Sequence, residues 1–292
     1  MGRSDRSERK ISLWAMILGG LAVLAWGSAC PRVETGEARG VVAMSPALTE
    51  IVLELGAGDA LLGTSPYTTD VRASGVRRID SQGSLETIVS LKPSKVLMHP
   101  TERALSEKLE MLGISTLMLR VDTVPDVEAS VMEAGRALGR GEEASRLVAG
   151  MRESMAANRA EFGKVSRGRA LIIVDRLDAR VQQFYIAQAP SYLAEVIAGC
   201  GFEVISTRGG SWVRIDAEKL IELDPEVIVY IVHDAGEKGE ILQMFRKYYS
   251  SLGAVRGDRV LVYGNPSVLV PGPLLGRKQR EVCEALLVEG KQ

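Results

Sequence analysis

The chain has 292 residues, of which 46% are hydrophobic and 25% are charged, with a formal net charge of −1 at pH 7. This length fits one large domain or two small ones, and the composition is that of a globular protein. A net charge so close to zero gives no electrostatic reason to expect a nucleic acid or another polyanion as partner.

Residues 1–30 have the layout of a secretory signal, with a basic start followed by the uncharged, mostly apolar run Ile11–Trp26. That run is shorter than the ~20 residues that a membrane-spanning helix usually needs. The small residues before Cys30 resemble a bacterial lipobox, although Gly27 stands where Leu is usual. We therefore expect an exported, periplasmic or cell-envelope lipoprotein anchored through Cys30, with plain cleaved export and an uncleaved anchor as alternatives. Residues 31–39 suit a flexible tether.

Export implies an oxidising compartment, in which disulfides persist. If Cys30 is lipidated, Cys200 and Cys283 remain, and both lie in the second half of the chain. A disulfide between them and two buried free thiols are both compatible with the sequence.

Residues 40–123 alternate short apolar strands with amphipathic helices. Strands are expected at 41–44, 61–64, 95–98 and 115–119, and helices at 47–55, 84–93 and 102–112. This alternation predicts a mainly parallel sheet that is covered on both faces.

Ligands of such sheets lie at the carboxyl ends of the strands. Ser45, Tyr67, His99 and Arg120 follow predicted strands of this half. Each has an alternative role, Ser45 as a helix cap, Tyr67 as a surface residue and His99 as a structural residue beside Pro100.

A helical segment, residues 124–165, follows and is interrupted at 139–141. Its second helix would be ~30 Å long, about the width of a small domain. Residues 166–292 then return to alternation, with strands expected at 169–174, 184–187, 202–205, 227–232 and 260–263, and helices at 190–198, 216–225, 240–249 and 274–288. The fold class predicted is α/β, with two lobes of mainly parallel sheet covered by helices, a long backbone helix that joins them, and a cleft between them.

The two halves share a repeated module. Residues 84–93 align with residues 216–225, since both have a capping residue, a Glu two positions later, an apolar helical face and a Pro before a buried strand. Glu86 and Glu218 therefore occupy equivalent places. An acid in the first turn stabilises a helix by ~0.3–1 kcal/mol, which is the alternative explanation for each Glu.

Several stretches together resemble one protein family. They are residues 42–50, 55–63, 84–93, 191–193 and 216–225, with Pro271-Gly272-Pro273 before the last helix. Over about residues 40–288 the chain resembles the periplasmic binding proteins of cobalamin and ferric-siderophore ABC importers, the type with a helical backbone.

The resemblance implies a shallow cleft between two lobes and one exposed Glu on each lobe that docks onto the permease dimer. Glu86 and Glu218 match those positions, and two separated carboxylates suit orientation and steering of the encounter. It also implies a transported metal chelate, a ferric siderophore or cobalamin, and no resident cofactor. We expect a monomer that meets the membrane only through its anchor.

Large chelates of this kind need aromatic faces and a few polar or charged groups. The candidate ligand-binding residues are Tyr67, His99, Tyr185, Arg208, Trp212, Arg214 and His233. The arginines favour an anionic group such as a catecholate, carboxylate or phosphate. Haem with Tyr67 or His99 as axial ligand is a further candidate. A bare zinc or manganese site is disfavoured, since the chain has only two histidines.

Two other classes of function remain as alternatives. A lipid-anchored sensor would bind a ligand without serving an importer. An enzyme on the same scaffold is not expected, because the sequence contains no G-x-S-x-G, P-loop or H-E-x-x-H pattern and no nucleophile with a paired base.

Overall fold

The computed structural model describes residues 40–80, 84–174, 183–232 and 234–289. These residues belong to one compact unit, Glu37–Gln292. The predicted signal segment, the tether and Cys30 lie outside the described residues, as does His233. Among the helices of the described part, none is long and apolar enough to cross a membrane.

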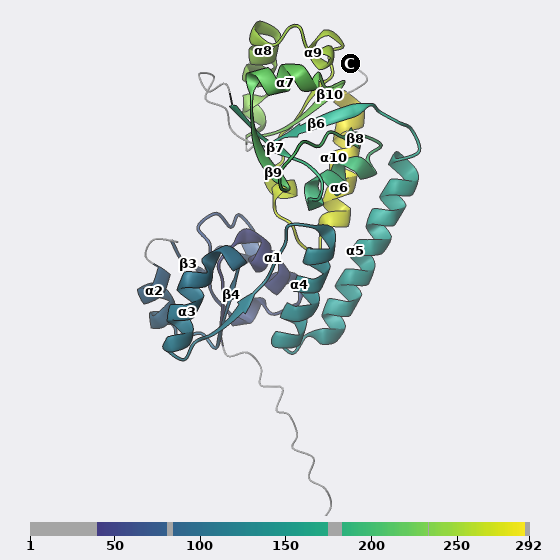
Figure 1. The fold of residues 1–292 in the computed structure, drawn as a ribbon. Coiled ribbons are helices and arrows are strands. Elements are labelled where there is room, and N and C mark those ends of the chain that lie inside the picture. Colours follow the sequence, from purple (N-terminus) through teal and green to yellow (C-terminus); the bar gives the residue numbers. More distant parts are fainter. Residues whose placement is uncertain (1–39, 81–83, 175–182, 233, 290–292) are drawn as a thin grey trace, which may run out of the picture. The chain divides into compact units, whose positions relative to one another are not determined.

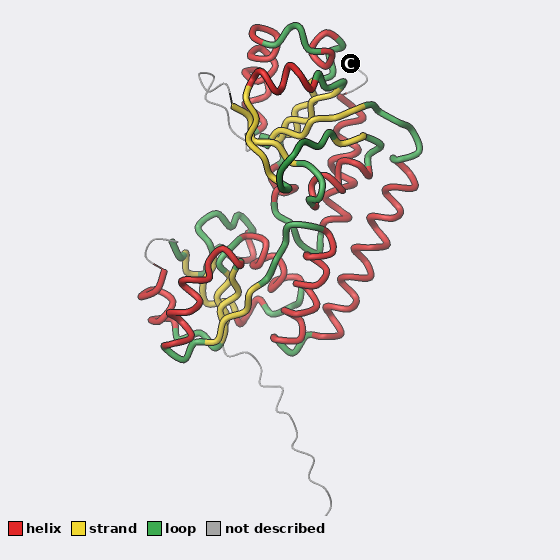
Figure 2. Tube along the Cα trace, viewed as in Figure 1, coloured by secondary structure: helices red, strands yellow, loops and turns green. Residues whose placement is uncertain are grey.

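The first sheet has, within the described residues, five strands in the order β3-β2-β1-β4-β5, and every neighbouring pair is parallel. Its strands are β1 (Val41–Ala43), β2 (Leu61–Thr64), β3 (Arg77–Arg78), β4 (Lys95–Met98) and β5 (Ser115–Met118). Its helices are α1 (Pro46–Glu54), α2 (Ser84–Leu91) and α3 (Arg103–Met111). These elements (residues 40–123, the N-terminal lobe) form a layer of strands with helices on both faces (Figures 1 and 2).

The joining segment consists of α4 (Val124–Ala137) and α5 (Gly141–Phe162). Thr123 caps α4, because its hydroxyl accepts the Asp126 N–H at 3.1 Å while the Asp126 carboxylate accepts the Thr123 N–H. At ~1.5 Å per residue α5 is about 33 Å long, and it runs from one lobe to the other (Figure 1). A Cβ at Gly135 would overlap Ala144, so glycine allows α4 and α5 to pack closely. The predicted long joining helix is confirmed.

The second sheet has the order β11-β10-β6-β7-β9, and β8 pairs with β6. Its strands are β6 (Arg169–Ile173), β7 (Gln183–Ala187), β8 (Glu203–Val204), β9 (Trp212–Asp216), β10 (Val227–Ile231) and β11 (Val260–Tyr263). Its helices are α6 (Tyr192–Gly199), α7 (Ala217–Leu223), α8 (Lys238–Tyr248), α9 (Gly253–Arg256) and α10 (Leu275–Glu289). These elements (residues 166–289) are the C-terminal lobe.

One hydrophobic core is shared by both lobes. It contains Val41 of β1, Val131 of α4, Val148 of α5, Val229 of β10 and Val282 of α10, all buried. The opposite face of each sheet has a core of its own, with α2 and α3 over the first sheet and α7, α8 and α9 over the second. Because the joining helices belong to the shared core, they are packed parts of both lobes.

Strand β9 is the main difference from the sequence-based expectation, which placed Trp212 in a glycine-rich loop. Instead Trp212 begins an edge strand that pairs antiparallel with β7, from Ala187↔Trp212 to Gln183↔Asp216. As an edge strand it has one buried residue, Ile215, between the exposed Arg214 and Asp216, so it lacks the continuous apolar run of the central strands. The sheet is therefore parallel in β6, β8, β10 and β11 but antiparallel at β7 and β9.

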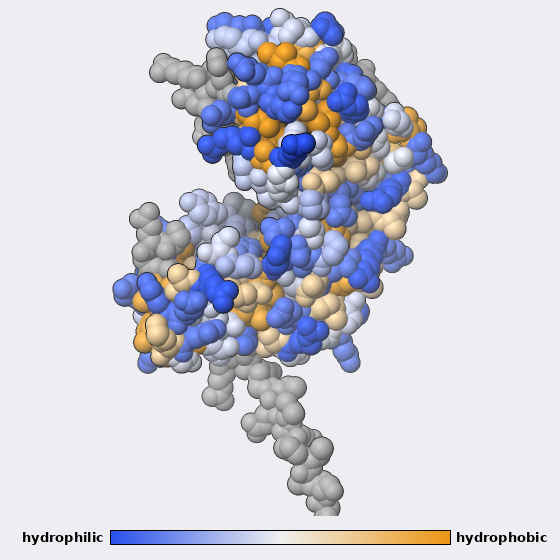
Figure 3. Space-filling model, viewed as in Figure 1, coloured by the Kyte–Doolittle hydropathy of each residue, from blue (hydrophilic) through white to orange (hydrophobic). Residues whose placement is uncertain are grey.

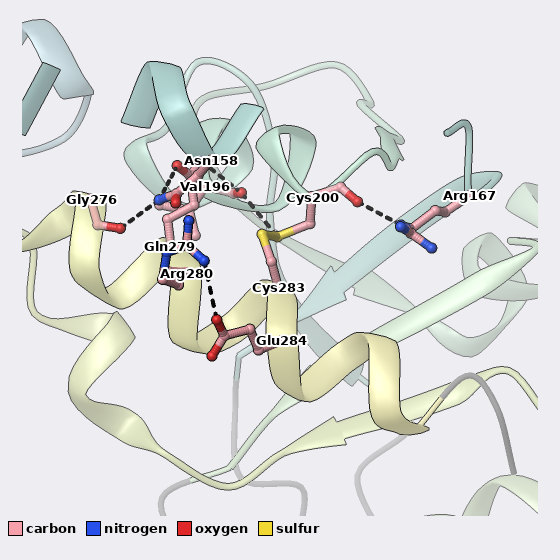
Figure 4. Close-up of a disulfide and its surroundings, with 9 residues drawn as sticks. All are labelled: Asn158, Arg167, Val196, Cys200, Gly276, Gln279, Arg280, Cys283 and Glu284. Atoms are coloured by element: carbon pink, nitrogen blue, oxygen red, sulfur yellow. Dashed lines mark hydrogen bonds and ion pairs between the residues drawn. A yellow bond between two sulfur atoms is a disulfide. The ribbon is translucent and has the colours of Figure 1, made fainter. Parts of the chain in front are cut away.

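Cys200, directly after α6, and Cys283 of α10 form a disulfide, with a Cα–Cα distance of 5.1 Å (Figure 4). Of the two possibilities that the sequence left open, the structure contains the bonded pair. Beside it, the buried Asn158 amide of α5 donates to the Gly276 carbonyl at 2.7 Å and to Gln279 Oε1 at 3.2 Å. The disulfide and these bonds hold α5, α6 and α10 together.

A buried ion pair links the two lobes. Lys278 Nζ of α10 lies 2.6 Å from Glu50 Oε2 of α1 and donates a second bond to the Val270 carbonyl at 2.6 Å. Burial lowers the pKa of the Lys278 ammonium, and the Glu50 carboxylate opposes that effect. A Cβ at Gly272 would overlap Glu50 Oε1, so the glycine between Pro271 and Pro273 leaves room for the carboxylate.

Replacing Cys200 and Cys283 together by Ser should lower the free energy of unfolding by about 2–5 kcal/mol, because the bond closes a loop between residues 83 positions apart. Urea unfolding under non-reducing conditions measures this loss. Thiol titration of the unfolded wild-type protein should find two more thiols after reduction than before. An unchanged thiol count would mean that the cysteines are not joined.

Lys278→Met should lower the free energy of unfolding by about 3–5 kcal/mol, since it leaves the Glu50 carboxylate buried without its cation. Lys219→Met is the matched control, because it removes a lysine from the exposed pair with Glu222 and should cost less than about 1 kcal/mol. Similar small losses for both variants in urea unfolding would contradict the structural role given to Lys278.

Candidate functional site

A cleft of about 600 Å³ lies between the lobes, and both contribute to its walls. From the N-terminal lobe it is lined by His99, Pro100, Thr101, Arg120, Val121 and Asp122. From the C-terminal lobe it is lined by Val174, Tyr185, Tyr192, Trp212, Leu269 and Pro271. The face drawn in Figure 3 is hollowed where the two lobes meet. Three of these residues lie at or just after the carboxyl ends of strands β4, β5 and β6, namely His99, Arg120 and Val174. Ligand sites of parallel sheets are expected at these strand ends.

Three aromatic side chains (Tyr185, Tyr192 and Trp212, the aromatic cluster) form part of the wall on the C-terminal lobe. The Tyr185 and Trp212 rings stack with centroids 6.1 Å apart and an interplanar angle of 15°. Tyr192 begins α6, lies 6.1 Å from Trp212, and is buried, which raises the pKa of its hydroxyl. Since Tyr185 and Trp212 are only half-buried, they offer a flat apolar surface to a ligand.

His99 is held by hydrogen bonds at both ring nitrogens. Nδ1 lies 3.1 Å from the Leu119 carbonyl, which only accepts, so Nδ1 carries the hydrogen. Nε2 lies 2.7 Å from the Ser45 hydroxyl, and that oxygen also accepts the Leu48 N–H as the N-cap of α1. The Ser45 hydrogen is therefore directed to Nε2. His99 is an oriented wall residue, and ligation of a metal through Nε2 would require breaking its bond to Ser45.

The charges on the N-terminal wall of the cleft are mutually compensated. Arg120 lies 3.3 Å from the Asp122 carboxylate and 3.6 Å from that of Asp126. The Arg120 side chain is 63% exposed, so it remains accessible from the cleft. Exposed pairs of this kind are weak, and a ligand carboxylate or hydroxamate can compete for the guanidinium.

The structure brings together three of the seven residues predicted to bind the ligand, since His99, Tyr185 and Trp212 all line the cleft. Tyr67 does not line it and is 80% exposed in the turn after β2. Arg208 and Arg214 line a separate pocket, and His233 lies outside the described residues.

Sequence reasoning missed other lining residues. Tyr192 and Pro271 lie in stretches that carried the family resemblance, but neither was recognised as a ligand contact. Asp122 had no distinguishing pattern. Arg120, in contrast, was expected at the carboxyl end of a strand, and it does line the cleft. What unites them is proximity across the two lobes, which spacing along the chain does not reveal.

The separate pocket has a volume of about 630 Å³ and lies at the edge of the second sheet. Its lining includes Arg208, Arg214 and Lys219 together with Asp216. Among the residues that the structure describes, no group of three or more His, Cys, Asp or Glu side chains is arranged to hold a metal ion.

Glu86 and Glu218 are exposed in the first turns of α2 and α7, one on each lobe. The repeated module extends to the backbone, because the residues before Pro93 and Pro225 both have positive φ, 48° at Lys92 and 34° at Asp224. A non-glycine residue is uncommon in that region, so its presence at both positions supports the equivalence of the two glutamates.

Residues 41–266 match a family model described as periplasmic binding protein. The chain is 24% identical over 259 residues to YvrC of Bacillus subtilis, an uncharacterized ABC transporter substrate-binding lipoprotein, covering 86% of this chain and 80% of YvrC. It is 26% identical over 199 residues to a cobalamin-binding protein of Halobacterium salinarum, covering 65% of this chain and 53% of that protein. The match thus spans about half the length of the second relative.

Solved structures share the fold. The vitamin B12 binding protein BtuF of Vibrio cholerae has a TM-score of 0.72 at 20% identity, covering 88% of this chain and 99% of BtuF. The heme-binding protein RhuT of Roseiflexus has a TM-score of 0.71 at 20% identity, covering 87% of this chain and 99% of RhuT. An Fe³⁺-hydroxamate transport protein of Saccharomonospora viridis has a TM-score of 0.67 at 23% identity, covering 86% of this chain and 93% of that protein. With the two lobes, the long joining helix and the cleft, the family match shows that the chain belongs to the periplasmic binding protein family.

Proposed function

We propose that the protein is the substrate-binding component of an ABC importer and that it captures a metal chelate in the cleft between its lobes. The observation that carries the proposal is the stacked pair of Tyr185 and Trp212, which faces a cleft that both lobes line. A cleft of about 600 Å³ with a flat aromatic wall suits part of a large, ring-containing or chelate ligand. The names of the relatives, an ABC transporter substrate-binding lipoprotein and a cobalamin-binding protein, point to the same class.

Among chelates, the hydrogen bonds of His99 favour a ligand whose metal already has its own donor atoms. Cobalamin and ferric siderophores meet that condition. Haem bound through His99 would have to displace the Ser45 hydroxyl from Nε2, where the two atoms now lie 2.7 Å apart. Tyr67, the other axial ligand considered, is not among the residues that line the cleft. The proposed cargo is therefore cobalamin or a ferric siderophore.

Delivery to the permease would use Glu86 and Glu218. Both carboxylates are exposed, one on each lobe, in equivalent repeats. Two separated negative charges can align the binding protein on basic residues of a permease dimer and speed the encounter. The name of YvrC supports a lipid anchor, which in this chain would be attached at Cys30 and would keep the protein at the membrane.

Titration of the purified protein with cyanocobalamin, haem, a ferric hydroxamate and a ferric catecholate tests the cargo. Cyanocobalamin or one of the ferric siderophores should bind one-to-one and haem should not, and Trp212→Leu should weaken the binding by about tenfold or more, because the loss of the ring removes stacking and apolar contact. Calorimetry is the measurement, since it does not depend on tryptophan fluorescence. Tyr248→Leu, which removes an exposed aromatic side chain on α8, is the control and should leave binding within twofold of wild type. Absence of binding across the panel would overturn the proposed cargo.

The double variant Glu86→Ala, Glu218→Ala should abolish uptake of the bound chelate into cells while its affinity stays at the wild-type value. The matched control is Glu142→Ala, Glu240→Ala. It removes the same charge from exposed first-turn positions of α5 and α8, so it reproduces any loss of helix stability. Uptake assays compare the two. Wild-type uptake by the first variant, or equal loss in both, would refute the docking role.

A further inference from the structure

We propose that the pocket at the edge of the second sheet binds a carboxylate or phosphate group through Arg208 and Arg214. This pocket (residues 206–208, 213–216, 219 and 223, the basic edge pocket) has a volume of about 630 Å³ and is distinct from the cleft. Its lining combines apolar side chains of Val213, Ile215 and Leu223 with cationic residues. An apolar floor with a few charged groups is the usual composition of a small-molecule site.

The charges of the pocket are unevenly compensated. Lys219 is already paired with Glu222 at 2.7 Å, and the Asp216 carboxylate accepts the Lys219 N–H at 2.7 Å as the cap of α7. The guanidinium groups of Arg208 and Arg214, in contrast, have no hydrogen-bond or ion-pair partner within the described part of the chain. A guanidinium without a carboxylate partner can form a two-pronged bond with a carboxylate or phosphate. The cleft differs, because there Arg120 already faces Asp122 and Asp126.

The loop that carries Arg208 is fixed by a buried side chain. Gln188 is 0% exposed, and its Nε2 donates to the carbonyls of Thr207 at 3.1 Å and Gly210 at 2.9 Å. Its Oε1 accepts from the Thr207 N–H at 2.7 Å and from the Thr207 hydroxyl at 3.0 Å. The Gln188 amide therefore forms all of these hydrogen bonds with Thr207 and Gly210, on either side of Arg208. Because the loop is already held in place, less conformational entropy is lost when an anion binds to Arg208.

The register of the sheet puts the basic edge pocket next to the cleft. Arg214 lies directly opposite Tyr185 in the β7–β9 pair, and it follows Trp212 by two residues on the same face of β9. Directly opposite residues have Cβ atoms about 4.5–5.5 Å apart. The anionic group therefore has two possible sources, a free small anion or an acidic arm of the chelate in the cleft.

Nuclear magnetic resonance titration of the purified protein with inorganic phosphate and with succinate tests the pocket at low ionic strength, where screening is weak. We expect saturable shifts of backbone amides between Thr207 and Lys219. The double variant Arg208→Gln, Arg214→Gln should weaken this binding at least tenfold. Arg246→Gln, an exposed arginine of α8 in the same lobe, is the control and should stay within twofold of wild type. Absence of saturable shifts, or equal weakening by Arg246→Gln, would overturn the proposal.

A second titration separates the two sources and uses the chelate that binds in the cleft. If an acidic arm of the chelate occupies the pocket, the loaded protein should no longer bind phosphate, and the double arginine variant should bind the chelate at least tenfold more weakly. If the ligand is a free anion, phosphate and chelate should bind together. Both results support anion binding by Arg208 and Arg214. The phosphate and succinate titration tests that binding even if no chelate of the panel binds in the cleft.

Discussion

Glu50 and Lys278 lie 228 residues apart in the chain, yet their side chains meet at 2.6 Å in the interior. Two charges buried in this way lose their hydration, and only a close, fixed geometry compensates for that loss. The pair therefore constrains where α1 and α10 lie. Both elements adjoin residues of the cleft, because Ser45, the N-cap of α1, holds His99, and Pro271, which lines the wall, shortly precedes α10. The position of the two cleft walls is thus linked to an ion pair that touches neither ligand-binding surface.

Three further contacts connect the helices α5, α6 and α10. The disulfide joins the end of α6 to α10, and Asn158 of α5 bonds to Gly276 at the start of α10. Arg280 of α10 reaches Glu161 of α5 at 2.6 Å. Each of them ties α5 or α6 to α10, so together they fix the joining helix α5 against the C-terminal lobe. The Glu50–Lys278 pair and the shared core reach across to the N-terminal lobe, and separating the lobes would disturb both.

Periodicity and capping residues were sufficient to predict most of the fold. Leu61–Thr64, Lys95–Met98 and Val260–Tyr263 are strands over the residues expected, because each is a short apolar run between turn residues. Strand β9 was not predicted because it has only one buried residue, Ile215, and begins shortly after Gly209 and Gly210, which are typical of a loop. The site was harder to predict than the fold. Trp212 and Tyr185 were identified as aromatic candidates, but their stacking depends on the β7–β9 register. Arg208 and Arg214 were identified as cationic, but whether they share the cleft depends on how the edge of the sheet is closed by α7.

The cleft and the basic edge pocket both include residues of β9 but differ in how they could discriminate between ligands. In the cleft the aromatic cluster is apolar and the exposed Arg120 already faces two carboxylates, so recognition there would rest more on shape and contact area than on charge. In the basic edge pocket the guanidinium groups have no internal partner among the described residues, so recognition there would rest on charge. A chelate that differs only in its metal presents nearly the same shape, so recognition by shape in the cleft would not distinguish it. A chelate with an added acidic arm differs in charge, and the guanidinium groups of the basic edge pocket would respond to that difference more strongly than Arg120, which already has carboxylate partners. Selection among related chelates would therefore depend on the residues at the edge of the sheet, which lie outside the cleft lining.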